Sequence, residues 1–245
     1  MDLKQTLELV EINGGNYHVN VDTSILPGIL HAAELGLVPS KMAEIIFSPL
    51  LHESSTHLFT PDYQGQMFAM FRHPVDRVVS LFHYLRSATW EPTYNPVLQN
   101  MTLQEYADSE LAESNFVVRA LVDKMEGTLT LNDVELAKEI LRRKCVVGLL
   151  DKWEESMDRF DNYFGFQPHG DRHEEARRCR MQLRESGGSN KHPHPHVNHT
   201  SEEYATLERI NTFDLILYDY IHELFLEQGM LANRLVAEGQ FSDVR

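Results

Sequence analysis

An apolar run at residues 67–71 that passes through Arg72-His73-Pro74 directly into a helical segment is the feature that most constrains the fold. Proline at the first position of a helix has the backbone angle that the helix needs, so we expect a strand, a tight turn and a helix over residues 74–88. Strands and helices alternate along the rest of the chain. This order predicts an α/β protein of three layers with a mostly parallel sheet.

The turn between this strand and helix has the properties of an anion site. The N-terminus of a helix presents unpaired N–H groups and the positive end of its dipole. Arg72 at the end of the strand is able to reach the same place, and Ser80 adds a hydroxyl from the second turn of the helix. The sequence therefore predicts a phosphate site here, with an ordinary surface strand, turn and helix as the alternative.

The same segment resembles the 3′-phosphate-binding motif of sulfotransferases that use 3′-phosphoadenosine 5′-phosphosulfate (PAPS). The motif Arg-[Asp/His]-Pro-x-x-Arg-x-x-Ser-x-[Tyr/Phe] is filled at every place, by Arg72, His73, Pro74, Arg77, Ser80 and Phe82. The His-Pro form is similar to the carbohydrate, or Golgi-type, branch. Residues 145–165 are similar to a later part of the family, a Val-Gly-Leu strand followed by a helix that ends in Tyr-Phe-Gly.

The resemblance spans residues 45–226 and implies a P-loop-NTPase-like sulfotransferase fold over residues 1–245 as one domain. It implies PAPS as the cofactor, no metal, and a carbohydrate or other hydroxyl-bearing (or amine-bearing) acceptor. Arg72, Arg77 and Ser80 would hold the nucleotide, although an ion pair with an acidic neighbour is an alternative for Arg77. The family's N-terminal strand and Lys-x-Gly-[Ser/Thr]-[Ser/Thr] loop have no match before Arg72. We therefore expect an N-terminally incomplete domain.

The resemblance also implies a catalytic base just before the central strand. His52 is the best match there, with Glu53 or His57 as alternatives and a structural histidine bonded to backbone as another. Asn115 and Arg119 resemble an Asn-x-x-x-Arg signature near the acceptor, and an exposed polar helical face explains them equally well. Trp90, Tyr94 and Trp153 are candidates for stacking on a sugar ring, and packing beside the core is the alternative.

The polar His/Pro segment at residues 186–200 has three interpretations. In the family, a loop of this kind closes over the nucleotide, which would place Ser189 and Lys191 at the cofactor. A solvated loop and a zinc site are the alternatives, and the lack of cysteine makes zinc the weakest of the three.

Composition sets limits on the function. The formal net charge of −15 disfavours a general nucleic-acid binder, because neutralisation of phosphates dominates that affinity. No apolar run is long enough to span a bilayer, and the first residues are not a signal peptide. As given, the chain therefore reads as soluble, whereas the family branch implies a Golgi lumenal location for a longer, anchored form. Cys145 is expected to be a buried thiol, and a pairing with Cys179 stays open.

Other elements follow from local patterns. We expect a hairpin over residues 7–12 and 17–21, a helix at 27–37 and a short buried strand at 44–48. Helices are expected to begin at Thr102, with a capping box to Glu105, and over residues 115–125, 130–144, 154–164 and 171–185. A buried strand is expected at 146–150, and one or two closing helices at 201–228 with a break near Asn211.

Three functions follow as hypotheses. The first is a PAPS-dependent sulfotransferase, and the second is a non-catalytic relative that keeps the nucleotide site as a binding module. A kinase-like phosphotransferase is the third, and it is disfavoured because the chain has no Walker lysine.

Overall fold

The computed structural model describes residues 6–12, 16–91, 93–165, 174, 178, 181–182 and 197–237. The fold is α/β, mostly helical, with a small parallel sheet. The chain forms two compact units. Unit 1 comprises residues 1–67 and 119–127, and unit 2 comprises residues 68–118 and 128–245. The segments that carry Cys179, Ser189 and Lys191 lie outside the described residues, as does most of the helix expected at 171–185.

Unit 1 begins with the predicted hairpin, which is confirmed. Strands β1 (Leu9–Ile12) and β2 (Asn16–Val19) pair antiparallel, with Leu9 opposite Val19. Helices α1 (Leu26–Glu34), α2 (Leu37–Ser40) and α3 (Leu51–Leu58) follow, and α1 packs against α3. Their buried side chains form the core of the unit: Ile29, Ala32, Leu37 and Leu58.

The strand expected at residues 44–48 is wrong. This segment has no regular secondary structure, and Phe47 is 75% exposed. Its apolar residues suggested a buried strand, but no described strand pairs with them. A short apolar run forms a strand only where a neighbour satisfies its backbone groups, and that neighbour is not a local property of the sequence.

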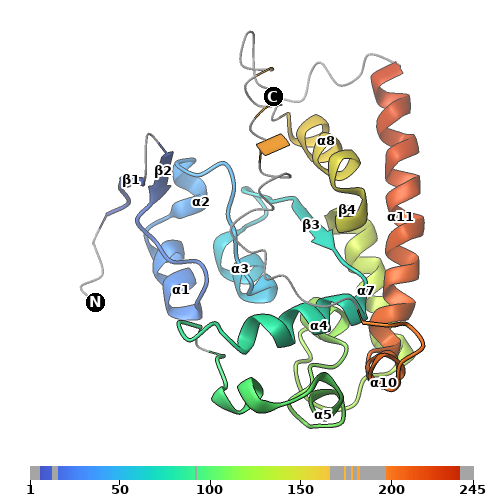
Figure 1. The fold of residues 1–245 in the computed structure, drawn as a ribbon. Helices are drawn as coiled ribbons and strands as arrows, with labels where there is room; N and C mark the ends of the chain where they lie inside the picture. The colour runs from blue at the N-terminus through green and yellow to red at the C-terminus, as the bar shows by residue number, and fades with distance from the viewer. Residues whose placement is uncertain are drawn as a thin grey trace. The chain divides into compact units, whose positions relative to one another are not determined.

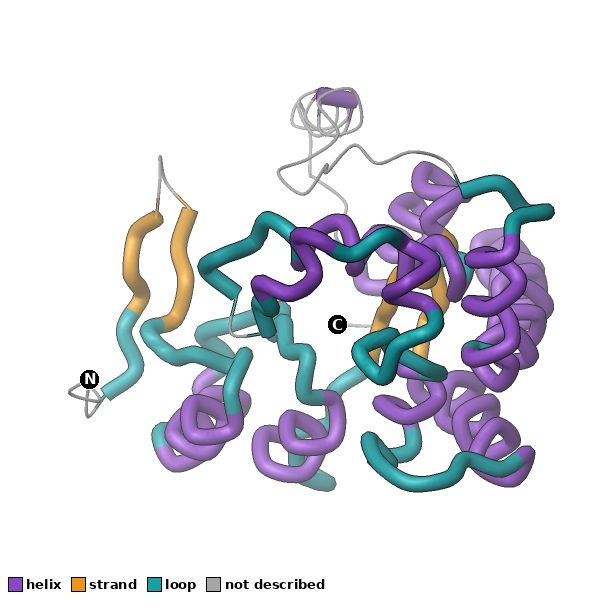
Figure 2. Tube along the Cα trace, turned by 60° about the horizontal axis from the view of Figure 1, so that its bottom comes forward, coloured by secondary structure: helices purple, strands orange, loops and turns teal. Residues whose placement is uncertain are grey.

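Unit 2 contains the predicted central strand. Strand β3 (Met67–Phe71) leads into helix α4 (Pro74–Leu85), and β3 pairs with β4 (Cys145–Leu149), as the two neighbouring orange strands of this unit in Figure 2 show. The two strands form a small parallel sheet. The connection between the strands carries the 3₁₀ helix η1 (Pro96–Asn100) and helices α5 (Leu103–Ala107), α6 (Phe116–Leu121) and α7 (Leu131–Lys144). In the described part of the chain this sheet has two strands. The P-loop-NTPase-like sulfotransferase fold has three layers and a larger sheet, and for this chain it stays a prediction.

The chain after β4 is helical. The 3₁₀ helix η2 (Leu150–Lys152) leads into α8 (Trp153–Phe164), and α10 (Glu202–Ile210) and α11 (Thr212–Ala237) close the unit. The predicted break near Asn211 is confirmed, because this residue separates α10 from α11. Figure 1 shows α11 running alongside α7 and β4.

Close packing against β4 explains its Val-Gly-Leu sequence. A Cβ atom at Gly148 would lie 2.6 Å from the Cζ atom of Phe160 on α8, so glycine is what allows the helix to approach the strand. All five residues of the strand are buried. Cys145 is buried, as predicted, and its burial raises the pKa of the thiol to about 12.

Helix α4 is held by a core that uses its apolar side. Val75, Val78, Val79 and Phe82 pack with residues of α5 and α10, and the Phe82 ring lies 4.7 Å from that of Tyr106. Phe82 is 1% exposed, so this motif position serves packing. The predicted Thr102–Glu105 capping box is confirmed at the start of α5.

The outer edge of β4 is closed by a side chain of α11. The amide of Gln228 accepts a hydrogen bond from Val147 N at 2.9 Å and donates one to Cys145 O at 2.7 Å. It thereby makes two of the hydrogen bonds that another strand would make at this edge. Both backbone groups belong to buried residues.

We predict that Gln228→Leu lowers the free energy of unfolding by about 2–6 kcal/mol, because two buried backbone groups lose their partners at about 1–3 kcal/mol each. Urea denaturation measures the change. Glu227→Leu, at an exposed position of the same helix turn, is the control and should change stability by less than about 0.5 kcal/mol. Equal stability of the two variants would show that Gln228 does not seal the sheet edge.

Candidate anion site and the predicted acceptor residues

The turn between β3 and α4 has the geometry expected of an anion site. His73 is the N-cap residue of α4, with φ −50° and ψ 130°, and its side chain does not cap the helix. Pro74 has no N–H group, and Arg77 N donates the first helical hydrogen bond, to His73 O at 2.9 Å. The N–H groups of Val75 and Asp76 precede that bond and have no acceptor within the helix. The carboxylate of Asp76 lies in the same turn, so a bound anion requires an additional positive charge.

Arg72 directly precedes the N-cap residue His73 and is therefore the candidate for that charge. Both Arg72 and Ser80 are partly exposed, and neither side chain forms a hydrogen bond or ion pair with another described residue. Ser80 lies six residues after Pro74, about 9 Å along the helix axis at 1.5 Å per residue. A phosphate that meets both side chains would therefore lie beside the first two turns of α4 and not beyond the end of the helix.

Arg77 has a structural environment. Its guanidinium forms an ion pair with Glu113 and lies 4.7 Å from the centre of the Phe116 ring, while its Nε atom is buried without a partner. Glu113 N in turn donates to the hydroxyl of Tyr106. The ion pair of Arg77 with Glu113 is the alternative that the sequence analysis gave for Arg77. It links α4 to the segment before α6.

Aromatic residues of the closing helices surround the turn. The ring of His73 meets Tyr218 edge-on at 5.5 Å and stacks on Tyr204 at 6.4 Å. Burial raises the pKa of Tyr218 to about 12, and the charges of Asp151 and Asp76 add to this rise. Sequence reasoning missed these tyrosines because they lie more than a hundred residues after the motif.

Asn115 joins two helix N-termini. It has a left-handed backbone, with φ 51°, and is buried. Its Oδ1 atom accepts hydrogen bonds from Phe213 N and Asp214 N, and its Nδ2 atom donates to Ile210 O. Its backbone N–H donates to Asn211 Oδ1. Asn115 was predicted to bind the substrate that accepts the sulfuryl group, but both polar atoms of its side chain have partners inside the protein.

Asp214 was also missed and completes this junction. Its two carboxylate oxygens accept hydrogen bonds from Val117 N at 3.0 Å and Val118 N at 2.8 Å, at the start of α6. Burial raises the pKa of Asp214, and these two hydrogen bonds oppose the rise. The one local signal for such a role was an acidic residue in the first turn of a helix.

Arg119 also has backbone partners. Its Nη1 atom donates to Lys124 O and Gly127 O, both at 3.1 Å, and closes the loop after α6. That helix is shorter than the residues 115–125 expected from the sequence. Asn115 and Arg119 are thus both engaged in stabilising this part of the chain.

The three candidate bases lie on helix α3 of unit 1. His52 is half-buried, and its Nε2 atom lies 2.8 Å from Leu121 O. Because a carbonyl oxygen only accepts, Nε2 carries the proton, and Nδ1 is the basic nitrogen of the neutral ring. Glu53 and His57 lie four residues apart and share one face of α3, which is turned by about 100–140° from the direction of His52. The structure therefore does not bring the three candidates together.

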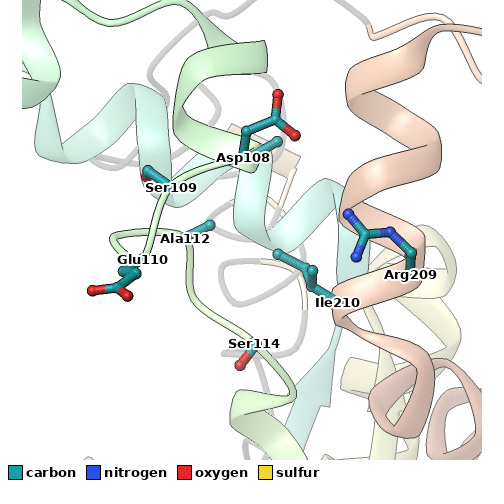
Figure 3. A pocket seen from close by; sticks show the side chains of 8 residues that line it. Asp108, Ser109, Glu110, Ala112, Ser114, Arg209 and Ile210 are labelled. Atoms are coloured by element: carbon teal, nitrogen blue, oxygen red, sulfur yellow. The ribbon is translucent and has the colours of Figure 1, made fainter.

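A polar groove of about 540 Å³ lies between the segment after α5 and the end of α10. In Figure 3 Arg209 borders it on one side, while the carboxylate of Glu110 points away from this arginine. Its lining residues are Ala107, Asp108, Ser109, Glu110, Ala112, Ser114, Arg209 and Ile210. None of the site residues expected from the sequence lines this groove.

The described residues contain neither a metal site nor a membrane-spanning helix. No group of three histidine, cysteine or acidic side chains is placed to hold a metal ion. No helix in the same residues combines the length and apolar character needed to cross a membrane.

Comparison with known proteins gives one partial match. Over 98 residues the chain is 31% identical to a protein of Archaeoglobus fulgidus that is described as uncharacterized. The match covers 37% of this chain and 39% of the archaeal protein, so the chain spans well under half of its relative's length. No family model matches the chain, and no solved structure matches it.

Proposed function

We propose that the protein binds a 3′-phosphoadenosine nucleotide at the turn between β3 and α4 and acts as a PAPS-dependent sulfotransferase. The observation that carries this proposal is the pair Arg72 and Ser80. They lie eight residues apart beside a helix N-terminus without a side-chain cap, and neither has a partner among the described residues. An arginine and a hydroxyl are donors that a phosphate monoester accepts, and the positive end of the helix dipole lies nearby.

Each of these residues has its own role in the proposed reaction. Bound PAPS supplies the activated sulfuryl group. Arg72 and Ser80 hold the 3′-phosphate and so position the nucleotide. His52 Nδ1 would take the proton from the carbohydrate-like hydroxyl, or the amine, that receives the sulfuryl group. Arg77 supports this arrangement indirectly, since its charge is used by Glu113.

Calorimetry with 3′-phosphoadenosine 5′-phosphate tests the nucleotide site. A charged hydrogen bond contributes about 1.5–3 kcal/mol, so Arg72→Ala should weaken binding by about ten-fold or more. Arg209→Ala is the matched control, because it removes the same charge from the groove, and it should bind like the unaltered protein. Adenosine 5′-phosphate has no 3′-phosphate and should not distinguish Arg72→Ala from the unaltered protein. Equal affinity of both variants for the 3′-phosphorylated nucleotide would refute the assignment.

A specific observation favours a second candidate, a nucleotide-binding module without catalysis. The sequence ahead of Arg72 contains no Lys-x-Gly-[Ser/Thr] loop for the 5′-phosphosulfate. Incubation with labelled PAPS and a panel of glycans separates the candidates. Transfer of label supports the enzyme, whereas nucleotide binding that depends on Arg72 without any transfer supports the module.

A further inference from the structure

The outer edge of the hairpin in unit 1 is open. Strand β1 pairs with β2 on one side, and no other described strand pairs with its other side. In Figure 2 it is the outer strand of the hairpin, the one that leads to the N-terminus. All four of its residues are exposed, including the apolar Leu9 (55%) and Val10 (40%). The strand also lacks the bulge, the proline and the lysine by which many edge strands prevent the addition of another strand.

The hydrogen bonds of the hairpin define which backbone groups of β1 face outward. Asn20 N donates to Glu8 O at 3.0 Å, and Glu8 N donates to Asn20 Oδ1 at 2.8 Å. In an antiparallel ladder every second residue bonds to the same neighbour, so Val10 also directs its N–H and C=O groups toward β2. Leu9 and Glu11 therefore direct theirs away from β2. These four backbone groups are available to a further strand.

We propose that β1 pairs antiparallel with β1 of a second copy of this chain, about a two-fold axis at Val10. The two hairpins then form one four-stranded sheet, which is more stable than a hairpin with two open edges. Leu9 of each copy exchanges two backbone hydrogen bonds with Glu11 of the other, so all four outward groups are used. Val10 lies opposite Val10 of the second copy, in a pair without hydrogen bonds, where side chains approach most closely.

Charge and strand length select this register. The outward groups of the two copies meet only when the axis lies at Leu9, Val10 or Glu11. An axis at Glu11 would place two carboxylates directly opposite each other, which is destabilising. An axis at Leu9 would require the backbone of Leu7, which precedes the regular strand. The axis at Val10 uses only groups of β1, and it places Glu8 and Glu11 opposite apolar residues.

The assembly is expected to stop at two copies and to be weak. Its outer edges are the two β2 strands, where Val19 O already accepts a hydrogen bond from Val21 N at 2.7 Å, so that edge is incomplete. A four-residue strand pair buries less area than the about 1,600 Å² of a standard interface. The net charge of −15 on each copy opposes association. We therefore expect a dissociation constant in the micromolar range. This pairing does not depend on the proposed nucleotide site.

The side chain at position 10 provides a direct test. Leu7 and Val19 pack against the core of unit 1, and Val10 lies on the opposite face of the hairpin, so its replacement leaves that core intact. Analytical ultracentrifugation over a concentration series, at about 0.15 M salt, should show a reversible monomer–dimer equilibrium for the unaltered chain. Val10→Lys and Val10→Glu should each weaken the dimer by about ten-fold or more, because like charges then meet at the axis.

A mixture of the two variants identifies the second copy as the occupant. Equal amounts of Val10→Lys and Val10→Glu should form a mixed dimer more tightly than either variant dimerises alone, since lysine then lies opposite glutamate. Tyr17→Lys is the matched control, because Tyr17 is exposed on β2, away from the axis, and it should dimerise like the unaltered chain. Melting temperatures establish that the variants are folded.

A backbone variant tests the strand pairing itself. Glu11→Pro removes an outward N–H group and leaves the bonds to β2 in place, so it should weaken the dimer. Glu11→Thr retains that N–H group and should dimerise at least as well as the unaltered chain. The proposal would be overturned by an unaltered chain that stays monomeric throughout the series, or by a mixture of the two Val10 variants that stays monomeric. Tighter dimerisation of Val10→Lys alone would also overturn it, because an axis at Leu9 pairs position 10 with Glu8.

Discussion

Replacement of Asn115 by alanine is expected to lower the free energy of unfolding by about 3–5 kcal/mol. The substitution removes three hydrogen bonds to backbone groups of the α10–α11 junction, at Ile210, Phe213 and Asp214. Each buried backbone group left without a partner costs about 1–3 kcal/mol, with water repairing part of the loss at the helix end. Alanine at φ 51° adds about 1 kcal/mol of backbone strain. Domains are stable by about 5–15 kcal/mol, so the loss is a large fraction of the total.

Chemical denaturation of three variants separates these contributions. Asn115→Gly loses the same hydrogen bonds without the strain and should be more stable than Asn115→Ala by about 1 kcal/mol. Asn115→Asp retains the acceptor for Phe213 N and Asp214 N but loses the donor to Ile210 O, so it should retain part of the stability. A contrary outcome would be that Asn115→Ala unfolds like the unaltered protein but no longer transfers a sulfuryl group to its substrate. Asn115 would then belong to the substrate-binding site that the sequence suggested.

Replacement of His52 by glutamine is expected to reduce kcat for sulfuryl transfer by roughly 10²–10⁴-fold, the usual contribution of a general base. The glutamine amide is able to donate to Leu121 O as His52 Nε2 does, but it cannot accept a proton at the position of Nδ1. Steady-state kinetics and melting temperature are measured together. Nucleotide affinity should be nearly unchanged, because the base meets the acceptor and not the cofactor.

The same assay distinguishes catalysis from structure. A purely structural His52 would be replaced well by glutamine and poorly by alanine, because only the hydrogen bond to Leu121 O would matter. Wild-type kcat in His52→Gln would thus assign the residue a structural role. Glu53→Gln and His57→Ala, on the same helix, are the matched variants. If one of them loses kcat and His52→Gln does not, that residue is the catalytic base in place of His52.

Local elements of the fold were readable because their causes lie within a few residues. The capping box at Thr102 and Glu105, the hairpin of β1 and β2, and the strand-turn-helix at Pro74 each depend on neighbours in sequence. The extent of the sheet was not readable. The strand expected at residues 44–48 failed because strand formation requires a partner elsewhere in the chain.

The candidate site was also predicted from local features, and its ligand stays a prediction. Arg72 and Ser80 were identified from a strand and a helix that adjoin, and the structure leaves both side chains without described partners. Arg77 carries the same charge as Arg72 a few residues later, yet it is bound to Glu113. Residue type and spacing alone do not distinguish an arginine that awaits a ligand from one that already has an ion pair.

The sequence by itself determined the strand, turn and helix that carry the candidate anion site, because backbone preferences and caps act over a few residues. Tertiary structure alone decided the partners of Asn115, Asp214 and Gln228, which bond to groups 81 to 99 residues away. Hydrogen bonds are short and directional, so which polar groups meet is set by how distant helices and strands pack, and no local pattern of residues encodes that packing.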